Sequence, residues 1–131
     1  MGYAPIVASW LLKTEPSEYS FADLVTDKRT RWDGISNAVA LKHARAMQKG
    51  DRVVIYHTGG ERRAVGLAEV VSSGDPPEVK AIAALPEPVG LDVIKASALF
   101  RESPLVKIGR LSVVPLDEKQ VAFIVGRGKL R

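Results

Sequence analysis

The order of apolar and polar residues divides this chain into short strands and short helices. Runs of aliphatic and β-branched residues predict strands at residues 7–13, 52–58, 63–72, 78–85 and 111–116. The first of these segments is apolar on both faces, which is typical of a central strand, and Pro16 follows it because proline donates no ladder hydrogen bond. Gly59-Gly60-Glu61 predicts a hairpin between the second and third strands.

Capping residues and helical spacing predict helices between these strands. Ser20 followed by Asp23 predicts a short helix that continues to about residue 26. Asn37 is suited to cap a second helix, and Gly50 is suited to end it. One side of this second helix carries Leu41, Ala44 and Gln48.

The C-terminal part of the chain continues the same alternation. Residues 91–100 have helical spacing, and Pro104 stops that helix. Asp117 with Gln120 begins the last helix, which buries Val121, Ile124 and Val125. Because no repeat, linker or low-complexity segment interrupts the chain, we expect one domain over residues 1–131, an α+β fold with a strongly bent, mainly antiparallel sheet.

Composition narrows the classes of function. The chain has 131 residues, of which 46% are hydrophobic, enough to bury a core within one domain. It has no cysteine, which excludes disulfides, thiolate nucleophiles and cysteine-ligated zinc and favours an intracellular protein. No apolar run approaches the roughly 18 residues of a membrane span, and the first residues lack the basic region of a signal peptide. We therefore expect a soluble, cytoplasmic protein with no membrane contact.

The formal charge of +4 is unevenly distributed. Residues 101–131 hold seven basic and three acidic side chains, whereas residues 1–100 hold twelve of each. A positive C-terminal segment could attract phosphate by long-range steering, or it could be a solvated basic tail.

The two tryptophans are the most informative side chains because each lies among polar residues and turn formers. Trp32 precedes Asp33-Gly34, a turn signal, which favours an aromatic wall on which a planar base could stack; a buried core role is the alternative. Trp10 lies in the first predicted strand, where a core role is favoured over a ligand wall.

Polar residues beside the tryptophans are candidates for reading the edge of a base. Lys13 and Glu15 lie on one face of an extended segment and bring a donor and an acceptor, although they could merely pair with other charges. Asn37 offers an amide, but its side-chain oxygen could instead cap the following helix.

Three further candidates lie on later strands. Tyr56 and His57 are neighbours on one strand, so only one of them is expected to face a given pocket; a structural histidine is as consistent with this pattern as a ligand contact. Ser112 is polar in an apolar strand and is either a pocket hydrogen-bonding group or a solvent-facing residue.

Basic residues could hold a nucleic-acid backbone. Lys42, Arg45 and Lys49 share one side of the second predicted helix at i, i+3 and i+7, and Arg110 lies near the last strand. The alternative for the helix is a solvated charged face.

Five motifs span most of the chain in a fixed order: Trp10-Leu-Leu-Lys-Thr-Glu-Pro-Ser-Glu-Tyr-Ser20, Trp32-Asp-Gly-Ile-Ser-Asn37, Lys49-Gly-Asp-Arg-Val-Val-Ile-Tyr-His57, Val65-Gly-Leu-Ala-Glu-Val70 and Gly109-Arg-Leu-Ser-Val113. This series resembles the EVE domain family of the PUA-like superfamily. The resemblance implies a PUA-like β pseudo-barrel with short flanking helices, and recognition of DNA or RNA that carries a modified base, notably a modified cytosine.

The chain departs from the family pattern around its second motif. Ser36 and Ala38 stand where family members usually carry an arginine and an aromatic residue, and the region after Ser73 is shorter than in many members. Loss of those groups is expected to weaken phosphate contact or stacking.

Two other function classes remain open. Lys13, Thr14 and Glu15 could serve acid–base and nucleophilic roles in a small amidohydrolase acting on acylated nucleosides, although a lysine-activated threonine needs a third residue to complete the geometry. The chain could also be a protein-interaction module. We favour a monomeric nucleic-acid-binding module without enzymatic activity, and no metal or organic cofactor is implied, since His43 and His57 are the only histidines.

Overall fold

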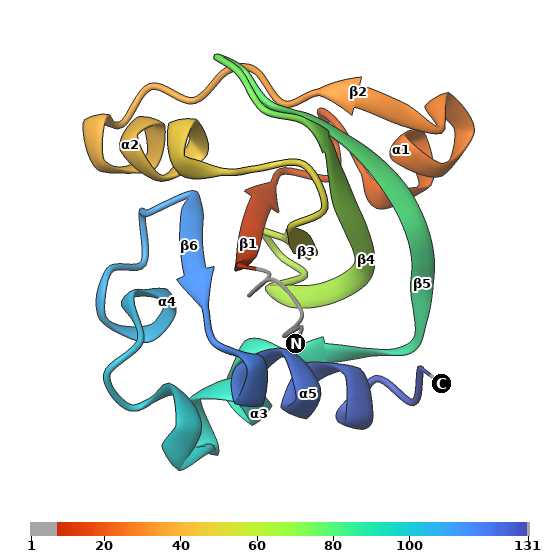
Figure 1. Ribbon diagram of the computed structural model, residues 1–131. Helices are drawn as coiled ribbons and strands as arrows, with labels where there is room; N and C mark the ends of the chain where they lie inside the picture. The colour runs from red at the N-terminus through yellow and green to blue at the C-terminus, as the bar shows by residue number, and fades with distance from the viewer. Residues whose placement is uncertain (1–7, 131) are drawn as a thin grey trace, which may run out of the picture.

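The computed structural model describes residues 8–130, which form a mixed α+β fold around one curled sheet of six strands (Figure 1). The strands are β1 (Ser9–Thr14), β2 (Arg29–Arg31), β3 (Arg52–His57), β4 (Arg63–Ser72), β5 (Glu78–Gly90) and β6 (Val113–Leu116). Their order is β2-β5-β4-β3-β1-β6, and only the β1–β3 pair is parallel. The predicted bent, mainly antiparallel α+β sheet is confirmed.

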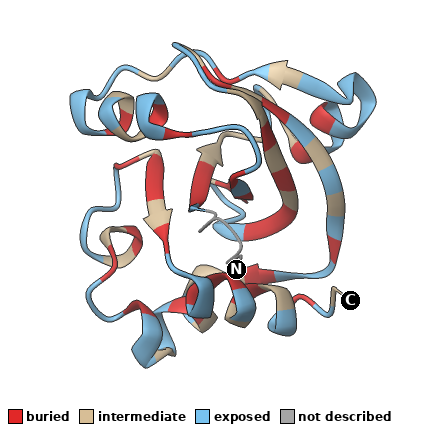
Figure 2. Ribbon diagram, in the orientation of Figure 1, coloured by how far each residue is buried: buried red, intermediate tan, exposed pale blue. Residues whose placement is uncertain are grey.

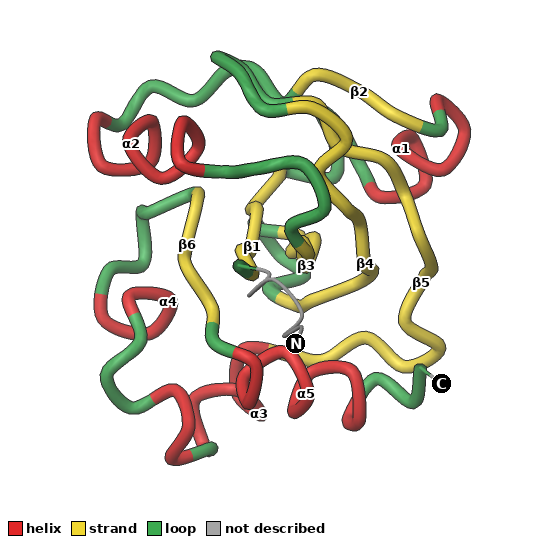
Figure 3. The backbone as a smooth tube through the Cα atoms, in the orientation of Figure 1, coloured by secondary structure: helices red, strands yellow, loops and turns green. Residues whose placement is uncertain are grey.

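Short helices flank the sheet on its outside (Figure 3). They are α1 (Phe21–Asp27), α2 (Ala38–Ala46), α3 (Leu91–Ala96), α4 (Pro104–Lys107) and α5 (Glu118–Arg127), with a 3₁₀ turn at Ala98–Phe100. In the view of Figure 1, α1 and α2 lie at one end of the curled sheet, and α3 and α5 lie at the opposite end. No helix within residues 8–130 has the length and apolar content needed to cross a bilayer.

The core lies inside the curl of the sheet (Figure 2). Leu11 and Leu12 of β1 are both fully buried, although neighbouring residues of a strand point to opposite faces. Both faces of β1 are therefore covered, as its continuous apolar sequence predicts. The prediction of a central strand is confirmed, and Val7, its predicted first residue, lies outside the described part of the chain.

Helix α1 is fixed to the sheet by its first residue, Phe21. The Phe21 ring lies so close to Gly66 of β4 that a Cβ atom at this glycine would come within 2.4–2.6 Å of ring carbons. The backbone N–H of Phe21 donates to Nε2 of His57 at 3.0 Å. Ser20 caps α1, as the sequence predicts, and its side chain and that of Asp23 form a capping box.

Helix α2 is shorter than predicted and ends at Ala46 rather than Gly50. Met47 takes an extended conformation and is fully buried, and the Asp51 carboxylate accepts a hydrogen bond from the N–H of Gln48. The predicted helical stripe is therefore wrong at Lys49, which lies in the turn beyond the helix.

Other differences follow from weak local signals. Strand β2 has only three residues, Arg-Thr-Arg, and no apolar alternation, so its sequence does not indicate a strand. The segment predicted as one helix at 91–100 divides at Ser97, whose hydroxyl accepts from the N–H of Leu99. Pro104 ends no helix; it begins α4, where its missing N–H is not needed, with Ser103 as the cap. Strand β5 continues five residues beyond its predicted end, to Gly90.

Gly66→Ala is expected to destabilise the protein by about 1–3 kcal/mol, because the added methyl group overlaps the Phe21 ring. Chemical denaturation measures the free energy of unfolding. Gly60→Ala is the control, since no heavy atom lies within 4 Å of its added Cβ, and we expect a change within about 0.5 kcal/mol. Equal stability of the two variants would contradict the close packing of Phe21 on Gly66.

Candidate nucleic-acid interface

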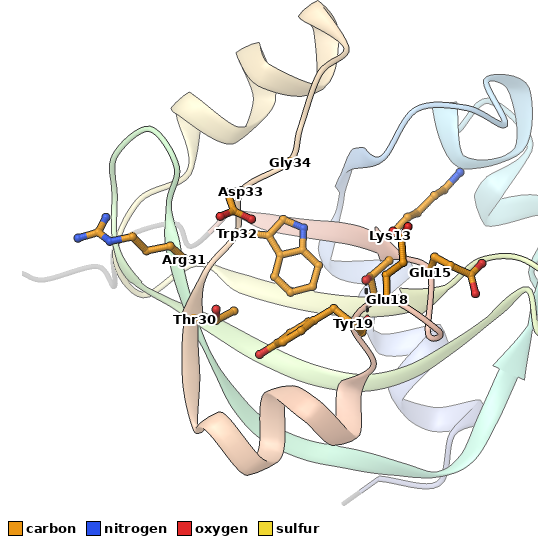
Figure 4. Close-up of a pocket in the computed structure, with 10 residues that line it drawn as sticks. Lys13, Glu15, Glu18, Tyr19, Thr30, Arg31, Trp32, Asp33 and Gly34 are labelled. Carbon is orange, nitrogen blue, oxygen red and sulfur yellow. Dashed lines mark hydrogen bonds between the residues drawn. The ribbon is translucent and has the colours of Figure 1, made fainter.

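A cleft of about 370 Å³ opens beside the end of β1 (Figure 4). Its walls come from the segment that runs from β1 into α1 and from the segment that runs from β2 toward α2. The lining residues are Lys13, Thr14, Glu15, Glu18, Tyr19, Thr30, Arg31, Trp32, Asp33 and Gly34. Three of the eight base-pocket residues predicted from sequence, Lys13, Glu15 and Trp32, therefore line one cleft.

Trp32 and Tyr19 form the aromatic part of the cleft. Their ring centroids are 6.0 Å apart and the rings are nearly perpendicular, at 83°. Trp32 is only 8% exposed, and its backbone N–H donates to the carbonyl of Pro77 at 2.8 Å. The Trp32 side chain is thus part of the core and also lines the cleft. From the sequence these two roles are alternatives, whereas in the structure they coexist.

Lys13 lies at one end of the cleft with its ammonium group already bound. Its Nζ donates to the carbonyl oxygen of Gly109 at 2.9 Å and lies 5.8 Å from the centre of the Tyr56 ring. Partial burial lowers the pKa of Lys13 from its usual value of 10.5. This hydrogen bond ties the loop before β6 to the wall of the cleft.

Glu15 is held by its own turn. Its Oε1 accepts hydrogen bonds from the N–H and the hydroxyl of Ser17, at 3.2 and 3.1 Å. Its Oε2 would lie 2.4 Å from a Cβ at Gly59, where φ is +72°. The left-handed backbone favours glycine there, and a larger residue would make the end of the Glu15 side chain shift.

The predicted amidohydrolase arrangement of Lys13, Thr14 and Glu15 is not assembled in this geometry. The hydroxyl of Thr14 donates to the carbonyl oxygen of Tyr19 at 2.6 Å, and Lys13 donates to Gly109. Since the threonine proton is directed to a carbonyl and not to a basic group, the hydroxyl is not activated for attack.

Trp10 and Asn37 do not line the cleft, and both have partners elsewhere. The indole N–H of Trp10 donates to Asp51 at 2.9 Å, and the side chain is 8% exposed. The side-chain oxygen of Asn37 accepts from the N–H groups of Val39 and Ala40, at 2.9 and 3.0 Å, so it caps α2.

Tyr56, His57 and Ser112 also lie outside the cleft lining. Tyr56 and His57 are both buried, and burial raises the pKa of Tyr56. His57 is a structural residue: Nε2 accepts from Phe21, and Nδ1 lies 2.9 Å from Oε1 of Glu61. Because Nε2 is an acceptor, the ring proton is on Nδ1, and this N–H donates a hydrogen bond to the Glu61 carboxylate. The hydrogen bond lowers the pKa of Glu61. Ser112 is half-buried, and its carbonyl accepts from the N–H of Lys13.

The predicted backbone-binding residues differ in their availability. Arg45 pairs with Asp75 at 2.9 Å. Lys42, Lys49 and Arg110 are exposed and form no ion pair within residues 8–130. Three cations on the surface thus have no competing carboxylate partner in the described part of the chain.

Sequence reasoning did not assign seven residues of the cleft to the base pocket: Thr14, Glu18, Tyr19, Thr30, Arg31, Asp33 and Gly34. It considered Thr14 only for a catalytic role. Each of the seven lies within four residues of Lys13, Glu15 or Trp32 in the sequence, and this proximity was the available signal. The alternation of side chains along a strand does not predict which residues line this cleft. Turns and a three-residue strand present consecutive side chains to the same cavity.

Burial and the hydrogen bond from its hydroxyl to Asp27 raise the pKa of Tyr19 from 10.0 to about 12. Between these pH values the unfolded chain loses this proton while the folded chain keeps it, so we expect the stability contribution to be full below pH 10 and to be lost as pH rises toward 12. The difference in tyrosinate absorbance between the wild type and Tyr19→Phe measures the titration. Asp27→Asn should move it to lower pH, and a midpoint near pH 10 in the wild type would contradict the assigned environment.

Comparisons with known proteins agree with this architecture. The EVE domain family model matches residues 8–127. The solved structure of Rpa0253 from Rhodopseudomonas palustris is 33% identical with a TM-score of 0.87, covering 95% of this chain and 94% of that one. A hypothetical protein from Leishmania major is 29% identical, with a TM-score of 0.87 and coverage of 95% and 96%.

A third solved structure is human THYN1 in complex with DNA containing 5-methylcytosine. It is 22% identical, with a TM-score of 0.83 and coverage of 95% and 99%, a likeness that shows the common fold. No curated protein sequence matches the chain. With the family model matching residues 8–127, the chain belongs to the EVE domain family.

Proposed function

We propose that this protein binds nucleic acid carrying a modified base, most specifically a modified cytosine, and holds an unstacked base in the cleft beside Trp32. The observation that carries the proposal is the cleft itself, which joins two aromatic side chains to polar groups in one cavity of about 370 Å³. Membership of the EVE family and the likeness to human THYN1, solved with DNA containing 5-methylcytosine, support the same conclusion.

The chemistry of the cleft suits a cytosine. Trp32 and Tyr19 supply the apolar and aromatic surface, since every base has a face that can contact an aromatic ring. Glu18 and Asp33 are exposed carboxylates without an ion pair or side-chain hydrogen bond within residues 8–130. A carboxylate accepts from the exocyclic amino group of cytosine, and uracil or thymine lacks this donor.

The remaining lining groups determine what the site can hold without rearrangement. Lys13, Thr14 and Glu15 already make hydrogen bonds to the protein, so they are fixed walls. Thr30 contributes a hydroxyl at the opposite side of the cleft, next to Arg31, which is exposed and basic at the rim. A phosphate that follows a bound base would therefore meet positive charge at the cleft edge.

Trp32→Leu is expected to weaken binding to an oligonucleotide with one 5-methylcytosine by about 1–3 kcal/mol, the usual loss when base–aromatic contact is removed. Trp10→Leu is the matched control, because Trp10 is equally buried at 8% exposure but lies outside the cleft. Both variants lose core packing, so fluorescence anisotropy is measured at a temperature where circular dichroism shows both to be folded. Equal losses in the two variants would exclude Trp32 as part of the binding site.

A preference for the modified base is tested with single-stranded and duplex oligonucleotides that carry cytosine or 5-methylcytosine at one position. Burial of one methyl group is worth about 0.8 kcal/mol, so we expect roughly fourfold tighter binding to the methylated member of each pair at the same salt concentration. Equal affinities across the panel would reject recognition of the modification and leave a general nucleic-acid-binding function.

Backbone contact is tested by the triple variant Lys42→Gln, Lys49→Gln and Arg110→Gln. Each lost phosphate contact should make the dependence of log affinity on log salt concentration shallower by roughly 0.7–0.9. Lys119→Gln is the control, because Lys119 is exposed on α5 at the opposite end of the sheet (Figure 1). An unchanged slope in the triple variant would show that these cations do not contact phosphate.

A further inference from the structure

Strand β5 has an edge that its neighbour β2 covers only in part. Strand β2 pairs with residues 78–80 of β5, and the N–H of Ala81 donates to the carbonyl of Lys28 at 3.0 Å. Beyond that point β5 continues to Gly90, and no strand within residues 8–130 pairs with this side of it. Figure 1 shows this part of β5 at the margin of the sheet. Pro86 and Pro88 have no N–H, and the N–H of Glu87 donates to the carbonyl of Gly128 at 3.0 Å. The part of this edge open to another strand is therefore the short stretch before Pro86.

A hollow of about 490 Å³ lies along this edge. It is lined by Val25, Lys28, Arg29 and residues 80–84. The hollow therefore lies where a strand that continued the line of β2 would sit. Residues 81–84 span about 10 Å at the usual rise of a strand, so the edge accommodates about four residues of an added segment.

Two half-exposed apolar side chains face solvent at this hollow. Val25 of α1 is 52% exposed and Ile82 of β5 is 53% exposed, and the alanines between them are small. An extended peptide presents side chains alternately to its two sides, so every second residue could cover these apolar groups.

The charges around the hollow select the occupant. Lys28, Arg29 and Lys80 line it. Arg29 pairs with Glu78 at 3.1 Å and Lys80 lies 3.9 Å from Glu69, whereas Lys28 is exposed and has no ion pair within residues 8–130. A second copy of the chain paired antiparallel through residues 81–84 would place its own cations at the far end of the pairing and leave Lys28 without a partner, whereas an acidic segment would be attracted to Lys28.

We infer that the open edge of β5 binds an extended, acidic segment of another protein, which adds a strand next to residues 81–84 and covers Val25 and Ile82. This surface is separate from the base-binding cleft, and the two have no lining residue in common. The EVE domain would then join a nucleic-acid site to a protein-binding site on one small chain.

The test begins with a phage-displayed library of random ten-residue peptides, selected on the whole protein. We expect enriched peptides in which acidic residues alternate with β-branched residues. A synthetic copy of one enriched peptide should shift the amide NMR signals of residues 81–85 and slow their hydrogen exchange. Its affinity should fall as salt concentration rises.

Val25→Glu and Ile82→Glu should each lower the affinity for that peptide at least tenfold, because each removes apolar surface and places a negative charge against the acidic peptide. Val39→Glu is the matched control: Val39 is also on a helix and 50% exposed, but it lies outside the hollow. All three substitutions are at exposed positions, and thermal melting confirms that each variant is folded. Binding of the 5-methylcytosine oligonucleotide should be unchanged from the wild type in Val25→Glu and Ile82→Glu, so failure of this inference is separable from failure of the proposed function.

Three results would overturn the inference. The selection could enrich no acidic extended sequence, or the two groove variants could bind the peptide as tightly as Val39→Glu. Sedimentation could also show a dimer of the wild type that Ile82→Glu abolishes, in which case the occupant of the edge is a second copy of the chain.

Discussion

The docking of Phe21 onto the sheet is the contact on which the rest of the site depends. Its ring packs on Gly66, and its backbone N–H donates a hydrogen bond to Nε2 of His57. The other ring nitrogen of His57 donates to Glu61. This arrangement fixes the first residue of α1 and therefore the turn that precedes it. Tyr19, two residues earlier, takes its place in the cleft and accepts the Thr14 hydroxyl through its carbonyl oxygen. A core contact thus determines the shape of a surface cavity.

The aromatic side of the cleft is held with similar firmness. The backbone N–H of Trp32 is hydrogen-bonded to Pro77, and the side chain is mostly buried. Its ring therefore loses little further conformational entropy when a ligand binds. The exposed groups at the same site, Asp33 and Arg31, are free to adjust to the ligand. Rigid aromatic surface with adjustable polar groups around it is a favourable arrangement for a ligand that is flat but varies in its edges.

The sequence predicts structural features that depend on neighbouring residues, and it does not predict features that depend on residues distant in the chain. The capping boxes at Ser20 and at Asp117 and the apolar run of β1 are local, and the structure contains all three. The end of α2 is decided by Asp51. This buried carboxylate accepts hydrogen bonds from the indole N–H of Trp10 and from the backbone N–H of Gln48. No pattern within the helix itself contains that information, and the stripe extended to Lys49 was wrong for this reason.

The same distinction applies to the candidate site and to the open edge of the sheet. Lys13, Glu15 and Trp32 were identifiable because unusual side chains lie among turn residues, whereas Tyr19 enters the cleft only because α1 is docked as it is. Strand β2 begins at Arg29, directly after α1 ends at Asp27, and this late start is what leaves β5 uncovered beyond Lys80. Helix α1 therefore shapes both surfaces, because its docking places Tyr19 in the cleft and its end sets where β2 begins. A β2 lengthened at its start would cover the edge of β5 and remove the hollow beside Ile82, so the proposed protein-binding surface depends on where this strand begins.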